Sequence, residues 1–275
     1  MKFKYIIIGF NILIIFFLLV IALTPIAVLG MDSASKFWAS GWPLALILLA
    51  SLIGLNVFFL FNRRLFLLLE REDWPALVDY LERQVYERSR YSFRLVRLLA
   101  NSYVIMSDSA GVLRLEKKVG QAKPALLDSN ALVFGAAHIL GGSPAGAAAF
   151  FNARLEKGSP REPQWVRMFY GFSLLLSRAF DKAETEFRAL SLTSDDAIIT
   201  GLSAWFLSET LEKFSANPKD CRAVAEQGRL RLRKRLKKPA DWRKEVAKIE
   251  TGIHAAVFKK YIEQSEPWLF QEEQP

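Results

Sequence analysis

The chain has 275 residues, of which 52% are hydrophobic, and its formal charge is +9 at pH 7. A single cysteine excludes an internal disulfide and a zinc site built on several cysteines. Two histidines, His138 and His254, leave few groups for metal binding or acid–base catalysis. The composition fits a reducing compartment, and we expect no metal site and no cofactor.

Two apolar runs open the chain, at residues 5–30 and 43–62, and neither contains a charged residue. Each reaches the ~20 residues that an α-helix needs to cross a bilayer core of ~30 Å. The linker between them, residues 31–42, is too short to hold a domain. We therefore expect residues 1–62 to form a transmembrane helical hairpin. A cleaved signal peptide is the alternative for the first run, but its apolar region would be shorter. Asn11 either helps the two helices to pair or is a passive polar residue.

The basic residues that flank the two runs predict the orientation of the hairpin. Lys2 and Lys4 precede the first run, Arg63 and Arg64 follow the second, and the linker holds Lys36. Basic residues next to membrane spans favour the cytoplasmic side. We expect both ends of the hairpin, and the soluble domain that follows it, to be cytoplasmic.

A repeated pattern follows the hairpin. A small residue with a large apolar residue four positions later recurs every 35 or 36 residues. The four pairs are Ala76/Tyr80, Gly111/Leu115, Ala147/Phe151 and Ala183/Phe187. A small residue allows a second helix to approach closely, and the large residue one turn later fills the space beside it. No run alternates with period two, so strands are not expected and the fold class is predicted to be all-α.

The spacing of the two best units resembles the tetratricopeptide repeat. In each unit a glycine, Gly135 or Gly171, stands twelve positions before the alanine, and the aromatic follows the alanine after four more. The likeness implies paired helices stacked into an α-solenoid over residues 63–193. Leu99 departs from the pattern where a small residue is expected, and the period exceeds the usual one. An irregular helical bundle with a chance repeat is the alternative. The order of parts, two membrane helices and then repeats, is similar to HemY-type proteins of the bacterial inner membrane.

Residues 194–264 are predicted to form C-terminal helices, followed by an acidic tail at 265–275. We expect one helix over 219–238 and a last one over 241–264. Cys221 lies on the apolar stripe of the first of these, which indicates a buried and inert thiol. His254 neighbours the apolar stripe of the second, and we expect it to be a structural histidine with satisfied hydrogen bonds.

A basic patch covers the other face of the helix at 219–238. Its members are Arg229, Arg231, Arg233, Lys234, Arg235, Lys237 and Lys238. Such a cluster attracts anionic lipid on a cytoplasmic leaflet, an acidic protein or nucleic acid, or it is a solvated face without a partner. No nucleic-acid-binding module accompanies it, so we do not expect nucleic acid as the partner.

No catalytic constellation is visible, and we do not expect an enzyme. If the tetratricopeptide likeness holds, first-helix positions line a groove that binds a protein partner, at Trp165, Met168, Phe172 and Leu175. These positions are unusually apolar. Either the groove accepts an apolar helix or the C-terminal helices fold into it, and the cost of a large exposed apolar patch favours the second.

The predicted function is that of a membrane-anchored, tetratricopeptide-like scaffold or adaptor that binds a protein at the cytoplasmic face of the bacterial inner membrane. The alternative is a lipid-associated factor for envelope or cofactor biogenesis, which would use the basic helix and an apolar groove.

Overall fold

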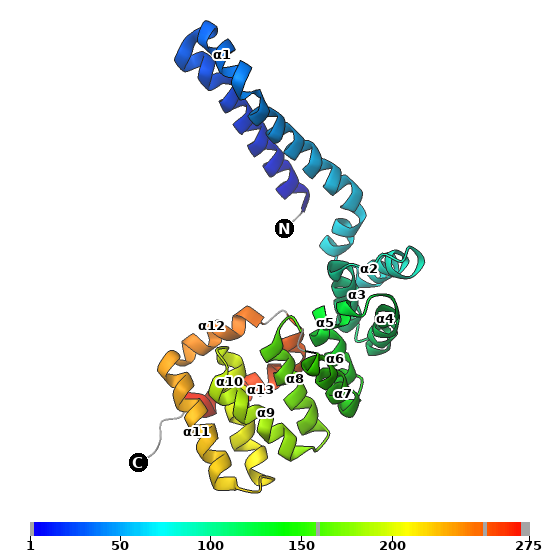
Figure 1. The fold of residues 1–275 in the computed structure, drawn as a ribbon, viewed down its shortest axis with the longest axis vertical. Helices are drawn as coiled ribbons and strands as arrows, with labels where there is room; N and C mark the ends of the chain where they lie inside the picture. Colours follow the sequence, from blue (N-terminus) through cyan, green and yellow to red (C-terminus); the bar gives the residue numbers. More distant parts are fainter. Residues whose placement is uncertain (1–2, 158–159, 250–251, 271–275) are drawn as a thin grey trace. The chain divides into compact units, whose positions relative to one another are not determined.

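The computed structural model describes residues 3–157, 160–249 and 252–270, and these residues contain helices but no strand (Figure 1). The all-α prediction is therefore confirmed. The helices are α1 (Phe3–Glu70), α2 (Trp74–Glu82), the π-helix η1 (Arg83–Glu87), α3 (Phe93–Ile105), α4 (Ser109–Ala122), α5 (Ala125–Ser129), α6 (Ala131–Leu140), α7 (Pro144–Glu156), α8 (Pro163–Leu176), α9 (Phe180–Thr193), α10 (Ala197–Glu209), the 3₁₀-helix η2 (Leu211–Lys213), α11 (Pro218–Arg235), α12 (Pro239–Ile249) and α13 (Ile253–Phe270). By their contacts they divide into two compact units, Met1–Leu81 and Glu82–Pro275.

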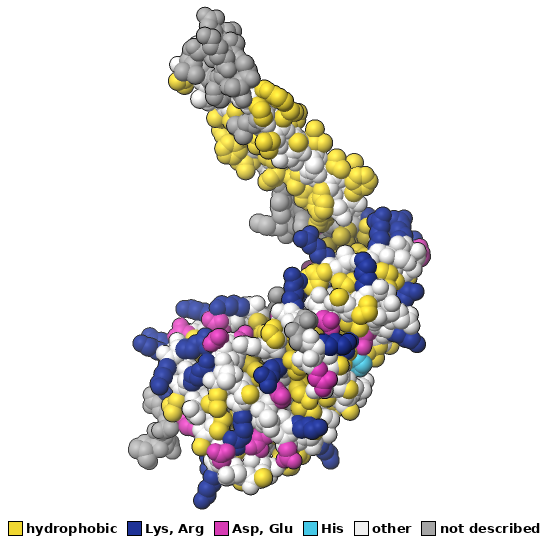
Figure 2. All heavy atoms as spheres, viewed as in Figure 1, with side chains coloured by type: hydrophobic (Ala, Val, Ile, Leu, Met, Phe, Trp, Pro, Cys, Tyr) yellow, Lys and Arg dark blue, Asp and Glu magenta, His cyan; other side chains and the backbone are white. Residues whose placement is uncertain are grey.

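The first unit consists mainly of α1, which doubles back on itself (Figure 1). Gly30 has φ 75° and ψ 170°, a conformation that only glycine adopts readily, and it breaks the helical backbone. The segments Ile8–Val28 and Gly41–Glu70 are long and apolar enough to cross a membrane. Hydrophobic side chains predominate on the part of this unit that Figure 2 colours by type.

Asn11 joins the two arms of α1. Its amide and that of Asn56 exchange two hydrogen bonds, with Nδ2 to Oδ1 distances of 3.2 and 2.7 Å. An amide in an apolar helix lowers its free energy by finding such a partner. Of the two interpretations of Asn11, the structure supports helix pairing.

One turn geometry recurs at the end of successive helices. Glu72, Ser107, Gly142 and Arg178 have positive φ angles of 52°, 58°, 77° and 61°. The residue after each donates its backbone N–H to the carbonyl five positions earlier, over 2.8–3.2 Å. This is the Schellman closure of a helix C-terminus. It marks the helix–turn–helix units at intervals of 35, 35 and 36 residues.

Within the second unit the paired helices contact one another in a regular order. The first helices α3, α6, α8 and α10 pack on the second helices α4, α7, α9 and α11 of their own pairs. Each second helix also packs on the first helix that follows it, and neighbouring first helices contact one another. Each pair thereby shares its core with the next pair.

Glycine permits close helix contacts in the two best repeat units. A Cβ atom built on Gly135 would lie 2.1 Å from the Phe151 ring, and one on Gly171 would lie 3.1 Å from the Phe187 ring. Both rings are fully buried. The repeat pairs 111/115, 147/151 and 183/187 are buried as the pattern requires, whereas Ala76 and Tyr80 are half-buried.

The C-terminal helices differ from the expected ones. The basic helix α11 ends at Arg235, three residues earlier than predicted. The expected single helix over 241–264 is wrong, because α12 ends at Ile249 and α13 begins at Ile253. Gly252 lies in this break, and glycine is a poor helix former. The α13 helix continues to Phe270, and Leu269 is fully buried, so this part of the expected tail packs on the domain.

The glycine contacts predict a graded response to an added methyl group. Gly135→Ala should lower the free energy of unfolding by about 1–2 kcal/mol, because the clash with Phe151 exceeds the gain of about 0.5–1 kcal/mol in helix propensity. Gly171→Ala, with its looser contact, should be nearly neutral. Thermal unfolding of the full chain in detergent, followed by circular dichroism, measures both. Equal effects of the two changes would contradict the packing.

Candidate functional site

Helix α13 packs on the first-helix face, where its backbone lies close to α6 and α10 and its aromatic side chains contact α8. Phe258 of α13 is fully buried, and its ring centroid lies 6.2, 4.9 and 5.0 Å from those of Trp165, Phe169 and Phe172. Tyr261, one turn later, packs edge-on against Phe172 at 5.2 Å. Aromatic pairs of this kind add to the gain from burial. A C-terminal helix thus covers the aromatic residues of α8.

Of the residues predicted to bind a partner, Trp165 and Phe172 contact this helix. Trp165, Met168 and Phe172 are buried and Leu175 is half-buried. The Ser203 hydroxyl donates to the Met168 sulfur over 3.6 Å. A protein partner could reach Trp165 and Phe172 only if α13 moved away. Their role in partner binding stays a prediction, and it requires a state in which α13 has left this face.

Trp165 is held by a residue that the sequence analysis missed. Its indole N–H donates to Asp196 Oδ2 over 3.2 Å. The other carboxylate oxygen of Asp196 accepts from the backbone N–H groups of Ile198 and Ile199, at 2.8 and 3.1 Å, and so caps α10. An acidic residue directly before an apolar helix is the signal that could have found it.

His254 is positioned at the start of α13. Its ring lies 4.2 Å from that of Trp165, and its Nε2 lies 3.8 Å from a carboxylate oxygen of Glu162. Burial lowers its pKa below the ordinary 6.5, although Glu162 and Asp196 act in the opposite direction. Nε2 has no hydrogen-bond partner among the described residues, so the expectation of a fully satisfied histidine is wrong.

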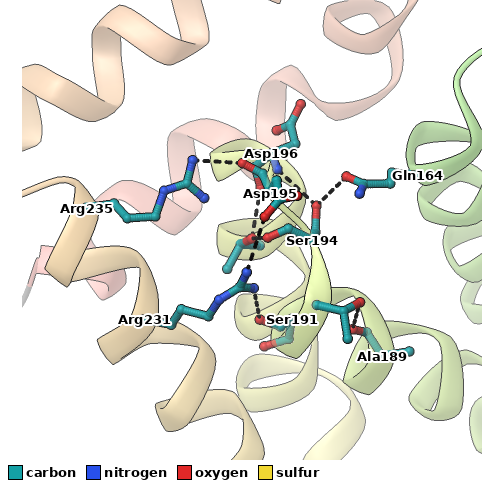
Figure 3. Close-up of polar contacts among 10 residues, drawn as sticks. Gln164, Ala189, Ser191, Ser194, Asp195, Asp196, Arg231 and Arg235 are labelled. Atoms are coloured by element: carbon teal, nitrogen blue, oxygen red, sulfur yellow. Dashed lines mark hydrogen bonds and ion pairs between the residues drawn. The ribbon is translucent and has the colours of Figure 1, made fainter.

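Two arginines of the basic patch bind the end of α9 (Figure 3). Arg231 donates to the carbonyl oxygen of Ser191 over 3.4 Å and lies 3.8 Å from the Asp195 carboxylate. Arg235 donates to the carbonyl oxygen of Asp195 over 2.7 Å. Carbonyls at a helix C-terminus carry partial negative charge and attract cations. These arginines therefore join α11 to α9.

Arg229 is buried, and it fixes the end of α13. Its guanidinium pairs with Glu226 at 3.2 Å, donates to the carbonyl oxygen of Leu269 over 3.3 Å and lies 5.4 Å from the ring centroid of Trp268. The rest of the patch differs. Arg233 is half-buried. Three exposed lysines make no ion pair or hydrogen bond within the described part of the chain: Lys234, Lys237 and Lys238.

Cys221 is fully buried, which confirms the prediction. Its thiol lies 3.5 Å from the carbonyl oxygen of Leu207 and can donate to it. Burial raises the pKa of this thiol and disfavours the reactive thiolate.

Exposed apolar side chains gather at the turns that close the first helices. Ile105, Leu140 and Leu176 are the last residues of α3, α6 and α8, and they are 53%, 49% and 42% exposed. Phe214 is 52% exposed, and it stacks on Phe180, which follows the turn after α8. These turns hold equivalent positions in successive pairs. We call the surface that they form the turn edge, and its residues are Ile105, Met106, Leu140, Leu176 and Phe214.

These features define an all-α protein with paired helices and an apolar helical hairpin. The sequence profile of a family described as "Uncharacterised Treponema protein" matches residues 111–271, and the chain belongs to this family. A Treponema pallidum (strain Nichols) protein described as "Uncharacterized protein" is 29% identical over 258 residues, which cover 91% of this chain and 81% of that protein. No solved structure matches. Neither match is to tetratricopeptide or HemY-type proteins.

The lowered pKa of His254 predicts a stability that depends on pH. The unfolded chain takes up a proton near pH 6.5 and the folded chain only at lower pH, so the free energy of unfolding falls as the pH drops below about 6.5. His254→Gln should reduce the difference between the melting temperatures at about pH 7.5 and about pH 5. Thermal unfolding of both proteins at the two pH values tests this. The same difference in both would exclude a contribution from His254.

Proposed function

We propose that this chain is a membrane-anchored adaptor. Its hairpin holds the paired helices at the cytoplasmic face of a bacterial inner membrane, and the paired helices bind a protein partner. The observation that carries the proposal is the turn edge. An adaptor needs a preformed apolar surface and needs no reacting groups.

The turn edge differs from ordinary surface apolarity because it repeats. Single exposed apolar residues are normal in soluble proteins. Among the described residues from Glu82 onward, however, Leu230 is the one large exposed apolar side chain away from this edge. A surface that presents one apolar side chain per helix pair suits an elongated protein partner.

The packing order of the helices supports a tetratricopeptide-like solenoid. Contacts run from each pair to the next, and the Schellman turns recur at nearly constant intervals. In such a repeat the first helices line the inner face. We propose that α13 acts here as the occupant of that face, and that the turn edge meets the partner.

The anchor and its orientation rest on the first unit. Two apolar arms of sufficient length and the hydrogen bonds between Asn11 and Asn56 suit a hairpin in lipid, where polar groups must pair internally. The basic residues that flank the arms favour a cytoplasmic location for both ends.

Site-specific photo-crosslinking in intact cells tests the adaptor. A photoreactive residue in place of Leu140 or of Leu176 should capture the same protein, whereas one in place of the exposed Lys182 on α9 should not. Leu140→Glu combined with Leu176→Glu should reduce co-purification of that protein on the order of tenfold or more, because a buried charge disrupts an apolar contact. Absence of a common adduct at the two positions would contradict the proposal.

A lipid-associated role is the second candidate, and the three unpaired lysines of α11 and its C-terminal end favour it. Basic residues near an anionic membrane contribute about 1 kcal/mol each. Lys234→Gln, Lys237→Gln and Lys238→Gln together should therefore weaken flotation of residues 82–275 with anionic liposomes on the order of 100-fold.

The matched control for the flotation changes three exposed lysines elsewhere, Lys117, Lys118 and Lys182, to Gln. This control has the same net charge as the α11 variant. Equal losses in the two variants would show attraction by net charge alone, and would exclude a lipid site at the end of α11.

A further inference from the structure

A pocket of about 570 Å³ lies between α3, α6 and the segments that end α12 and begin α13. Apolar side chains form part of its wall, among them Val104, Leu132 and Ile253. Its volume is in the range of sites for small organic molecules. The pocket is separate from the aromatic contacts of Phe258, and it leaves part of the first-helix face uncovered by α13.

Two arginines of this pocket come from different elements and converge on one ring. The guanidinium carbons of Arg97 and Arg161 lie 5.6 and 4.2 Å from the ring centroid of Phe93. Neither arginine makes an ion pair with an acidic side chain in the described residues. Two like charges near one ring repel each other, and an anion between them would remove that cost.

The other charged groups of the pocket do not neutralise the positive charge of Arg97 and Arg161. Asp128 lies 3.8 Å from Arg154, and Lys248 pairs with Glu245 at 2.6 Å. Glu162 is the remaining acidic residue of the wall, beside His254. The groups without an ion-pair partner of their own are then two arginines and one carboxylate, so the pocket carries a net positive charge.

The wall also contains an incomplete hydrogen-bonding group. Asn130 is 5% exposed, and its Nδ2 donates to the carbonyl oxygen of Leu126 over 2.9 Å. Its Oδ1 has no partner among the described residues. A buried acceptor without a partner costs free energy. A ligand that brings an O–H or N–H group to this wall would recover it.

We propose that this pocket binds a small organic anion. Its phosphate or carboxylate group lies between Arg97 and Arg161, and its apolar body packs against Val104, Leu132 and Ile253. Guanidinium groups suit both kinds of acid because they donate two hydrogen bonds in one plane. The site requires α13 in place but does not rest on the adaptor function.

Titration calorimetry of the full chain in nanodiscs, with empty nanodiscs as the blank, tests the site. Phenyl phosphate should bind more tightly than inorganic phosphate, because it adds an apolar body, and benzyl alcohol should not bind. Arg97→Gln combined with Arg161→Gln should weaken phenyl phosphate binding by about tenfold or more. Circular dichroism should show an unchanged helical content, since both arginines are exposed.

Arg94→Gln is the matched control, because Arg94 is exposed on the same helix and does not line the pocket. It should leave the affinity for phenyl phosphate unchanged. Equal affinity in the control and in the double variant would overturn the proposal, as would the absence of phenyl phosphate binding. Equal affinities for inorganic phosphate and phenyl phosphate would contradict the proposed packing of an apolar body against the pocket wall.

Discussion

The close approach of paired helices is the constraint on which the rest of the second unit depends. In two of the pairs an aromatic side chain of the second helix reaches the backbone of the first helix at a glycine, Phe151 at Gly135 and Phe187 at Gly171. A side chain at Gly135 would push the two helices apart. The first helices form a common face only when the pairs pack this closely, and α13 and the pocket depend on that face.

Occupation of that face by α13 changes where a ligand can bind. The aromatic residues of α8 are covered by α13, a segment of the same chain, and Arg229 of α11 holds the end of that segment at Trp268 and Leu269. The turn edge and the pocket beside the first turn of α13 stay accessible. Both surfaces arise from the packing, and neither contains an evident reacting group. The proposals of an adaptor and of an anion site follow from this division of the surface.

The sequence predicted the fold class, the two apolar arms and the register of the pairs, because these depend on local composition and on spacing. The turns could not be read in the same way. Four of them share one geometry, yet only Gly142 is a glycine, and the packed units hold Glu72, Ser107 and Arg178 at positive φ. The break between α12 and α13 was missed because the apolar spacing continues across it.

The basic patch is a second case in which the sequence did not reveal the tertiary contacts. Its charges were plain in the sequence, but their partners lie about forty residues away, at Ser191, Asp195 and Leu269. Spacing along one helix identifies a face and does not identify what packs on it. For this reason the division into structural arginines and free lysines, and the acceptor role of Asp196, required the tertiary contacts.

Helix α13 is a built-in part of the first-helix face. Amide hydrogen exchange of the full chain in nanodiscs measures this most directly. The amides of Ile253–Phe270 should exchange as slowly as those of Pro163–Leu176 on α8. Rapid exchange throughout α13, with α8 still protected, would contradict it.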